Sequence, residues 1–233
     1  MSSGQESGSK QFEQFQRIQV EMTDMSDATS FHVRQVGKDN LIYKKIDDAM
    51  AKFDPKTAEE LEKPIKKGTL CAALFSADGK WYRVRVLGTN GPGQFDVKFI
   101  DYGNTATVRG STDLRILPAH LLAYEPQAFQ SSFAYINTPR LERIQGKEAA
   151  KFVKGKGLYQ NHDAIVVEQS GNVLKLILLD SSEQDWSESL NAYIISEGLA
   201  SLTFTNQIGT KSNLNVPEEV EVWASFEEEA REA

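Results

Sequence analysis

The sequence predicts a mainly β protein with helices (α+β), in which a small barrel, residues 66–117, is inserted into a second barrel that is split in the chain. Three observations support this fold. Short strand-like runs with glycine-rich turns fill the inserted stretch. Two strand patterns precede it and three follow it. Residues 66–117 also carry eight Lys or Arg against four Asp, a net charge of +4, whereas the whole chain of 233 residues has a net charge of −7. This difference in charge indicates that residues 66–117 are a separate module inserted into another domain.

The chain is expected to begin with a disordered tail, residues 1–12, because this stretch is polar. Residues 13–65 then form the first part of the split barrel with a linker helix. Within them, residues 18–22 and 31–33 alternate apolar and polar side chains on either side of a turn-rich stretch. This is the pattern of a hairpin.

A helix is predicted over residues 39–54, followed by a polar linker. Its apolar side chains recur with the 3.6-residue period of one helix face. Asp39 can cap its start, and Pro55 ends it because proline cannot continue a helix.

The small barrel is predicted from four strand-like runs separated by turns that contain glycine. These runs are residues 69–76, 81–88, 94–101 and 104–110. A closed barrel leaves no exposed strand edge. A core of this size is marginal by itself, so we expect the neighbouring segments to support it.

Residues 118–233 are expected to complete the split barrel and to end in a helix. The predicted elements are a strand, a helix, a hairpin and two helices, over residues 130–136, 140–155, 164–180, 185–198 and 218–233. Asp185 and Glu188 form a capping box for the fourth of these. The two strands before the insertion and the three after it make one five-stranded barrel of the oligonucleotide-fold (OB-fold) type.

The composition excludes several kinds of site. The single cysteine, Cys71, cannot form an internal disulfide and is expected to be a small buried hydrophobe. The three histidines lack the spacing of metal ligands, so we expect no metal and no cofactor. No apolar run has the length of a membrane span and the start lacks a signal peptide, so we expect no membrane partner and a cytoplasmic location, with the nucleus as a second one.

The aromatic residues of the small barrel lie beside its turns: Phe75 and Tyr82 flank one turn, and Phe99 and Tyr102 precede the turn that contains Asn104. Such positions gather at one rim of a barrel. Aromatic faces around a gap suit a large, weakly hydrated cation. Methylated arginine is such a cation, because methylation keeps the charge and adds apolar surface. Asn104 can then accept a hydrogen bond from a remaining guanidinium N–H.

The residues alone leave an alternative open for these rings. Aromatic side chains fill the cores of most small barrels, so ordinary packing also explains them. Phe99 and Tyr102 moreover have opposite parity in a regular strand. They share one site only if the chain bends after Ile100 or Asp101.

The stretches GTLCAALFSADGKWYRVRV and FDVKFIDYGNTATV resemble the core of Tudor domains, specifically of the extended Tudor module. The flanking LPAHLLAYEPQAFQSSFAYI and LNAYIISEGLASL resemble the segment that leaves a Tudor core and the last helix of a staphylococcal-nuclease-like barrel. The arrangement over residues 13–233 is most similar to the C-terminal region of the Tudor staphylococcal nucleases. Extended Tudor modules of germline, Piwi-binding proteins share the same signatures. The resemblance implies a methylarginine cage made by Phe75, Tyr82, Phe99, Tyr102 and Asn104.

The resemblance also implies a function. We expect a non-enzymatic, monomeric adaptor that binds symmetric dimethylarginine in Arg-Gly peptides, such as spliceosomal Sm tails or Piwi-type amino termini, and links them to RNA-processing or RNA-silencing complexes. Catalysis is not expected, because the arginine-rich strand and the Asp-x-Pro-Glu turn of the nucleases are absent.

A rival function is the binding of single-stranded RNA by a basic strip on the small barrel. The candidate side chains are Lys66, Lys67, Lys80, Arg83, Arg85 and Lys98. Arg83 and Arg85 alternate with Val84 along the predicted strand, so their side chains are expected on its outward face. The strip is therefore also consistent with an ordinary solvated face.

Overall fold

The computed structural model describes residues 10–180, 185–204 and 216–232. Contacts divide the chain into two compact units. The small-sheet unit is Arg34–Ala128, and the barrel unit is Lys10–Val33 together with the chain from Phe129 onward. The small-sheet unit therefore begins at Arg34 and includes the helix and linker that the sequence assigned to residues 13–65.

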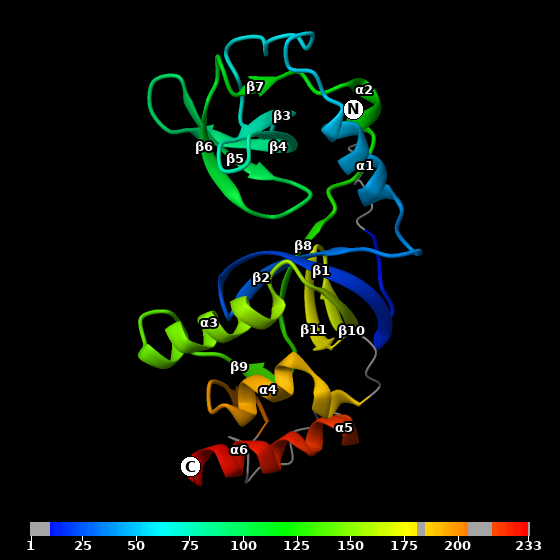
Figure 1. The fold of residues 1–233 in the computed structure, drawn as a ribbon, viewed down its shortest axis with the longest axis vertical. Coiled ribbons are helices and arrows are strands. Elements are labelled where there is room, and N and C mark those ends of the chain that lie inside the picture. The colour runs from blue at the N-terminus through cyan, green and yellow to red at the C-terminus, as the bar shows by residue number, and fades with distance from the viewer. Residues whose placement is uncertain (1–9, 181–184, 205–215, 233) are drawn as a thin grey trace, which may run out of the picture. The chain divides into compact units, whose positions relative to one another are not determined.

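The barrel unit contains the five-stranded closed barrel that the sequence predicts (Figure 1). Its hydrogen-bonded order is β1-β10-β11-β8-β2, in which β2 closes on β1. Two of these strands precede the inserted unit and three follow it, so the split-barrel prediction is confirmed. The strands are β1 (Gln16–Asp27), β2 (Ser30–Gln35), β8 (Ala128–Phe133), β10 (Asn161–Ser170) and β11 (Val173–Leu179).

The barrel unit also contains helices and short strands, several of which contribute side chains to its core. They are β9 (Ile136–Asn137), α3 (Ile144–Gly157), the 3-10 turn η1 (Trp186–Glu188), α4 (Leu190–Ser196), β12 (Ser201–Leu202), α5 (Glu218–Glu221) and α6 (Trp223–Glu232). The helix predicted from Asp185 starts later. Asp185 caps only η1, and the Ser189 side chain caps α4 by accepting a hydrogen bond from the Ala192 N–H. The predicted final helix is interrupted at Val222.

The predicted tail, residues 1–12, lies mostly outside the described residues. Its described end contacts the barrel unit. The Phe12 N–H donates to Gln169 Oε1 at 2.8 Å, and the Phe12 ring packs edge-on against Phe129 at 5.5 Å between centroids.

The small-sheet unit contains the five short strands of the predicted small barrel. They are β3 (Leu70–Phe75), β4 (Lys80–Thr89), β5 (Gln94–Phe99), β6 (Thr105–Arg109) and β7 (Leu114–Arg115). Their hydrogen-bonded order is β6-β5-β4-β3-β7. The ladder thus has edge strands, β6 and β7, where the sequence predicted full closure. Two helices, α1 (Ile42–Ala51) and α2 (Ala119–Leu122), complete the unit.

Helix α1 is shorter than predicted at both ends, and the side chain that bonds its first residue is Asn40, not Asp39. The Asn40 Oδ1 accepts a hydrogen bond from the Ile42 N–H at 3.2 Å. The Asn40 Nδ2 donates to the Gln35 carbonyl and to Gln127 Oε1, so its amide also ties α1 to the segment after α2.

Helix α1 packs on the small sheet through its apolar face. Ile46 and Met50 are buried with Ala72 of β3 and with Leu117 and Leu121. This cluster extends the core of the small sheet beyond residues 66–117. The expectation that the neighbouring segments support the small module therefore has a structural basis.

A chain of residues 66–117 alone should be much less stable than Arg34–Ala128. Burial of one Ile or Met side chain contributes roughly 1.5–3 kcal/mol. A loss of 1 kcal/mol lowers the Tm of a small domain by about 4–8 °C, so we expect a difference of at least ~10 °C in thermal unfolding followed by circular dichroism. Equal unfolding midpoints would show that α1 adds no stability.

Candidate functional site

The turn between β5 and β6 sets the geometry of the candidate site. Strand β5 ends at Phe99, whose carbonyl accepts hydrogen bonds from the N–H groups of Tyr102 and Gly103 at 3.2 and 2.7 Å. The Phe99 N–H donates to the Asn104 carbonyl at 2.9 Å. Gly103 has a φ of 98°, in the left-handed region that glycine adopts without a Cβ clash. The chain therefore turns directly after Phe99, earlier than the bend after Ile100 or Asp101 that the sequence required, and this turn lets Phe99 and Tyr102 share one site.

This bend brings together the four aromatic rings that the sequence singled out. The centroid distances are 5.1 Å for Phe75–Phe99, 5.2 Å for Tyr82–Tyr102, 5.9 Å for Tyr82–Phe99 and 6.3 Å for Phe75–Tyr82. The angles between ring planes are 71–79°. Rings at such angles form the walls of a box rather than a stack.

The rings differ in burial. Phe99 is 1% exposed and belongs to the core of the small-sheet unit with Val84 and Val97. Phe75, Tyr82 and Tyr102 are half-buried against that core. Core packing and a cation site are therefore compatible here: Phe99 forms the floor, and the other three rings can present a face to a ligand.

Both tyrosine hydroxyls are held by carboxylates. The Tyr82 hydroxyl donates to Asp78 Oδ2 at 2.6 Å, and the Tyr102 hydroxyl donates to Asp47 Oδ1 at 3.0 Å. Burial, followed by the Asp78 carboxylate, raises the pKa of Tyr82. Burial is also the largest cause of the raised pKa of Tyr102. The phenols therefore stay neutral, and two carboxylates lie beside the rings.

Arg34 fixes Tyr102 from a second direction. Its Nη1 donates to both carboxylate oxygens of Asp47 at 3.1 and 2.9 Å. Its guanidinium carbon lies 4.5 Å from the Tyr102 ring centroid and 5.1 Å from that of Tyr43. Sequence reasoning missed this support. The available signal was the i, i+4 pair of Tyr43 and Asp47 on the predicted helix, which places both side chains on one face.

The structure removes Arg83 from the predicted basic strip. The sequence placed it on an outward face, but it is 2% exposed. Its Nε and Nη2 donate to the two oxygens of Asp101 at 2.8 and 2.6 Å. Its remaining donors bond the carbonyls of Leu121, Tyr124 and Glu125 at 2.7, 2.7 and 3.0 Å. The parity argument failed because α2 and the residues after it cover this face of β4.

The ion pair braces the turn from the side opposite the rings. Asp101 is 2% exposed and also accepts a hydrogen bond from the Gln127 N–H at 3.2 Å. Burial raises the pKa of the Asp101 carboxyl, and the Arg83 guanidinium opposes that rise. The turn thus directs Asp101 inward and Tyr102 toward the ring cluster.

The other residues of the predicted strip are at the surface. Lys66, Lys67, Lys80 and Arg85 are exposed, and Lys98 is half-buried. Cys71 is fully buried, and burial raises the pKa of its thiol to about 12, so it packs as a small hydrophobe. Within the described parts of the chain, no group of three or more His, Cys, Asp or Glu is placed to hold a metal. The described helices include none that is long and apolar enough to span a membrane.

Comparison with known proteins identifies the family of this chain. Residues 15–135 match the family model described as Tudor domain. The human RING finger protein 17 is 30% identical over 223 residues, which cover 90% of this chain and 13% of that protein. The chain therefore corresponds to a small part of this relative.

Two solved domains share the fold. The extended Tudor domain TD3 of mouse TDRD1 is 25% identical, with a TM-score of 0.70, and covers 84% of this chain and 97% of that domain. The same domain has been solved with a MILI peptide containing dimethylarginine, at 24% identity and a TM-score of 0.71. The extended Tudor domain of Drosophila melanogaster Tudor-SN has a TM-score of 0.76 at 22% identity, and covers 93% of this chain and 95% of that one.

Proposed function

The chain belongs to the Tudor family and has the fold of an extended Tudor domain, and on that premise we propose that it is a non-enzymatic reader of methylarginine in peptides. The observation that carries the proposal is the box of four near-perpendicular rings at Phe75, Tyr82, Phe99 and Tyr102. The solved complex of the TDRD1 domain with a dimethylarginine-containing MILI peptide supports it.

The chemistry of this box suits a methylated guanidinium. Ring faces attract a cation, and the attraction grows when water is excluded. The Asp78 carboxylate, bonded to the Tyr82 hydroxyl, adds negative charge beside the rings, whereas the charge of Asp47 is balanced by Arg34. Methyl groups replace N–H donors that the rings cannot satisfy. The aromatic walls therefore favour a methylated side chain over an unmodified one.

Asn104 is proposed to recognise the methylation pattern. Within the described residues its side-chain amide makes no hydrogen bond, and it lies half-buried directly after the turn. Symmetric dimethylarginine keeps one N–H on each terminal nitrogen, whereas asymmetric dimethylarginine has one terminal nitrogen with none. The side-chain Oδ1 of Asn104 can accept from such an N–H, so we propose symmetric dimethylarginine as the preferred ligand.

A titration series tests the proposal. Four Arg-Gly peptides that differ only in arginine methylation (none, one methyl, asymmetric and symmetric) would be titrated by calorimetry. We expect the symmetric form to bind most tightly and the unmodified form most weakly. Equal affinity for the unmodified and the symmetric peptides would refute a methylarginine reader.

Replacement of Asn104 by alanine should reduce the discrimination among methylation states. A net hydrogen bond contributes about 0.5–1.5 kcal/mol, which corresponds to a roughly 2- to 12-fold change in affinity. We expect that loss for the symmetric peptide and a smaller one for the asymmetric peptide. The same calorimetric series on Asn104→Ala measures it, and an unchanged ratio of the two affinities would remove Asn104 from the proposed site.

We further propose that the chain acts as a monomeric adaptor in the cytoplasm, with the nucleus as a second location. Its partners would be proteins with Sm-type tails or Piwi-type amino termini, and it would link them to RNA-processing or RNA-silencing complexes. The MILI peptide bound by the TDRD1 domain supports the second class of partner. The rival, RNA binding by the strip on the small sheet, loses its central residue, because Arg83 is buried in an ion pair.

A further inference from the structure

Helix α3 of the barrel unit carries a row of lysines that the fold does not use. Lys147, Lys151 and Lys154 follow one another at i, i+4 and i+7 and are exposed, whereas Ala149 and Val153 face the barrel core. None of the three lysines has an ion-pair partner in the described chain. Like charges at this spacing repel each other and weaken a helix. Glu148 and Glu197 line a pocket with Lys151 and reduce this repulsion, so the row is an exposed basic strip that an external anion can reach.

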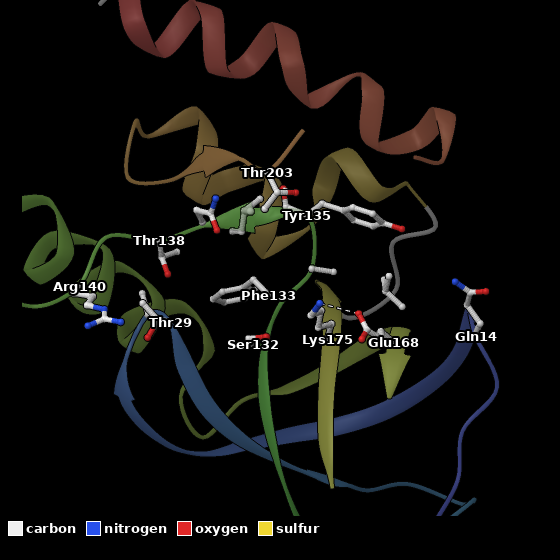
Figure 2. A pocket seen from close by; sticks show the side chains of 15 residues that line it. Gln14, Thr29, Ser132, Phe133, Tyr135, Thr138, Arg140, Glu168, Lys175 and Thr203 are labelled. Carbon is white, nitrogen blue, oxygen red and sulfur yellow. Dashed lines mark hydrogen bonds and ion pairs between the residues drawn. The ribbon is translucent and has the colours of Figure 1, made fainter. Parts of the chain in front are cut away.

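A cavity of about 810 Å³ lies next to the start of this helix, within the barrel unit (Figure 2). Thr29, from the loop between β1 and β2, lines it, and Ser132 and Phe133 line it from β8. Arg140 and Tyr135 also line it. The lining thus combines hydroxyl groups, aromatic rings, the Arg140 side chain and the ion pair between Lys175 and Glu168.

Arg140 connects the cavity to the lysine row. Figure 2 shows its side chain beside Thr29 and Thr138, at one end of the cavity. Its carbonyl lies against the first turn of α3, where a Cβ on Gly146 would be 1.9 Å from the Arg140 oxygen. The glycine therefore allows the residues before α3 to seat closely on the helix. Arg140 is exposed, and its guanidinium makes no ion pair with any described residue.

Tyr135 is held in an unusual backbone conformation at the cavity wall. Its φ of 64° is rare for a bulky residue. Its carbonyl fixes this conformation by accepting hydrogen bonds from the N–H and the hydroxyl of Thr203, at 2.9 and 3.1 Å. Such strain occurs most often at functional sites. The half-buried ring is thus placed at the wall of a cavity that also contains hydrogen-bonding groups.

We propose that this cavity and the lysine row form a binding site for single-stranded nucleic acid. Tyr135 would stack on a base, the hydroxyl groups of the cavity would bond base edges, and Arg140 with the lysine row would contact phosphates. In five-stranded oligonucleotide-fold barrels, the first hairpin loop and the second and third strands commonly bind such ligands. Thr29 and Ser132 occupy those places here, since β2 and β8 are the second and third barrel strands in the sequence.

An anionic membrane is the competing partner, because Leu141 and Ile144 are exposed near the lysine row, at 38% and 77%. A lipid surface would use the apolar and basic side chains but not a cavity lined by hydroxyl groups. The cavity therefore favours nucleic acid.

Fluorescence anisotropy with a labelled single-stranded RNA of roughly 12 nucleotides tests the site, because one oligonucleotide-fold barrel covers about 4–16 nucleotides. Wild-type protein should bind, with an affinity that falls steeply with salt. Reversal of the row, Lys147→Glu with Lys151→Glu and Lys154→Glu, should weaken binding at least tenfold and reduce the salt slope by roughly one for each lost phosphate contact. The matched control reverses Lys66, Lys67 and Lys80 on the small sheet and should change binding little.

Tyr135 is tested by a pair of variants. Tyr135→Phe keeps the ring, and Tyr135→Asn removes it while tolerating a positive φ. We expect Tyr135→Phe to bind RNA like wild type and Tyr135→Asn to bind roughly 5- to 150-fold more weakly, the range measured for base stacking. All variants should keep their affinity for the methylated peptide, which separates this site from the ring box. Amide hydrogen exchange of β8 and β11 checks that the barrel unit itself stays folded.

Three outcomes would overturn the proposal. One is no binding of RNA by the wild-type protein at low salt. Another is a loss of binding in the small-sheet control but not in the α3 variant. The third is binding to phosphatidylserine-containing vesicles without binding to RNA.

Discussion

Replacement of Asp101 by alanine should destabilise the small-sheet unit by about 3–5 kcal/mol, because it leaves the Arg83 guanidinium buried without its counter-charge. Arg83 is 2% exposed and makes five hydrogen bonds, of which two go to Asp101. A change of this size is a large part of the stability of a single domain. Amide hydrogen exchange of β4 and β5 measures the loss in this unit separately from the barrel unit.

The matched control is Arg85→Ala, two residues along the same strand. Arg85 is exposed and makes a single long bond, 3.4 Å, to the Gly68 carbonyl. Its replacement should change the unfolding free energy by less than about 0.5 kcal/mol. If Asp101→Ala were no more destabilising than Arg85→Ala, the ion pair would not brace the turn.

The second large effect is on peptide binding. Tyr82→Ala and Tyr102→Ala should each weaken binding of the symmetrically dimethylated peptide roughly 3-fold to 30-fold, because one aromatic contact with a cation is worth about 0.5–2 kcal/mol. Both rings are half-buried, so their removal should spare the fold more than removal of Phe99 would. Calorimetric titration measures the change.

Phe99→Ala serves as the contrast for this experiment. Phe99 is 1% exposed, and truncation of a buried Phe typically costs about 3–5 kcal/mol of stability. A loss of binding in Phe99→Ala would therefore not distinguish damage to the core from loss of a ring of the site. If Tyr82→Ala and Tyr102→Ala unfolded as readily as Phe99→Ala, the rings would serve mainly as core.

The split barrel could be predicted from the sequence because its strands carry local signals. Alternation of apolar residues and glycine turns marks strands without knowledge of their partners. The same kind of signal placed the four rings beside turns. The alternation of side chains along a strand could not show whether Phe99 and Tyr102 lie in the same site. They do so because of a turn stabilised by two hydrogen bonds to one carbonyl, and such a turn cannot be predicted from strand alternation.

The support of the site could not be predicted in this way. Arg83 alternates like a solvent-facing residue, and only the distant segment after α2 buries it. The contact of Arg34 and Asp47 with Tyr102 joins residues that are far apart in the chain. Strand and helix periods report which face a residue occupies, but not what covers that face.

A comparison of Tyr102→Phe with Tyr102→Ala tests the central claim most directly. Both variants lose the hydroxyl that bonds Asp47, but only alanine loses the ring face. With unfolding midpoints near wild type, we expect the phenylalanine variant to bind the symmetrically dimethylated peptide within about threefold of wild type, and the alanine variant to bind roughly 3-fold to 30-fold more weakly. If a well-folded Tyr102→Ala bound that peptide as tightly as wild type, the ring box would be ordinary packing and not a methylarginine site.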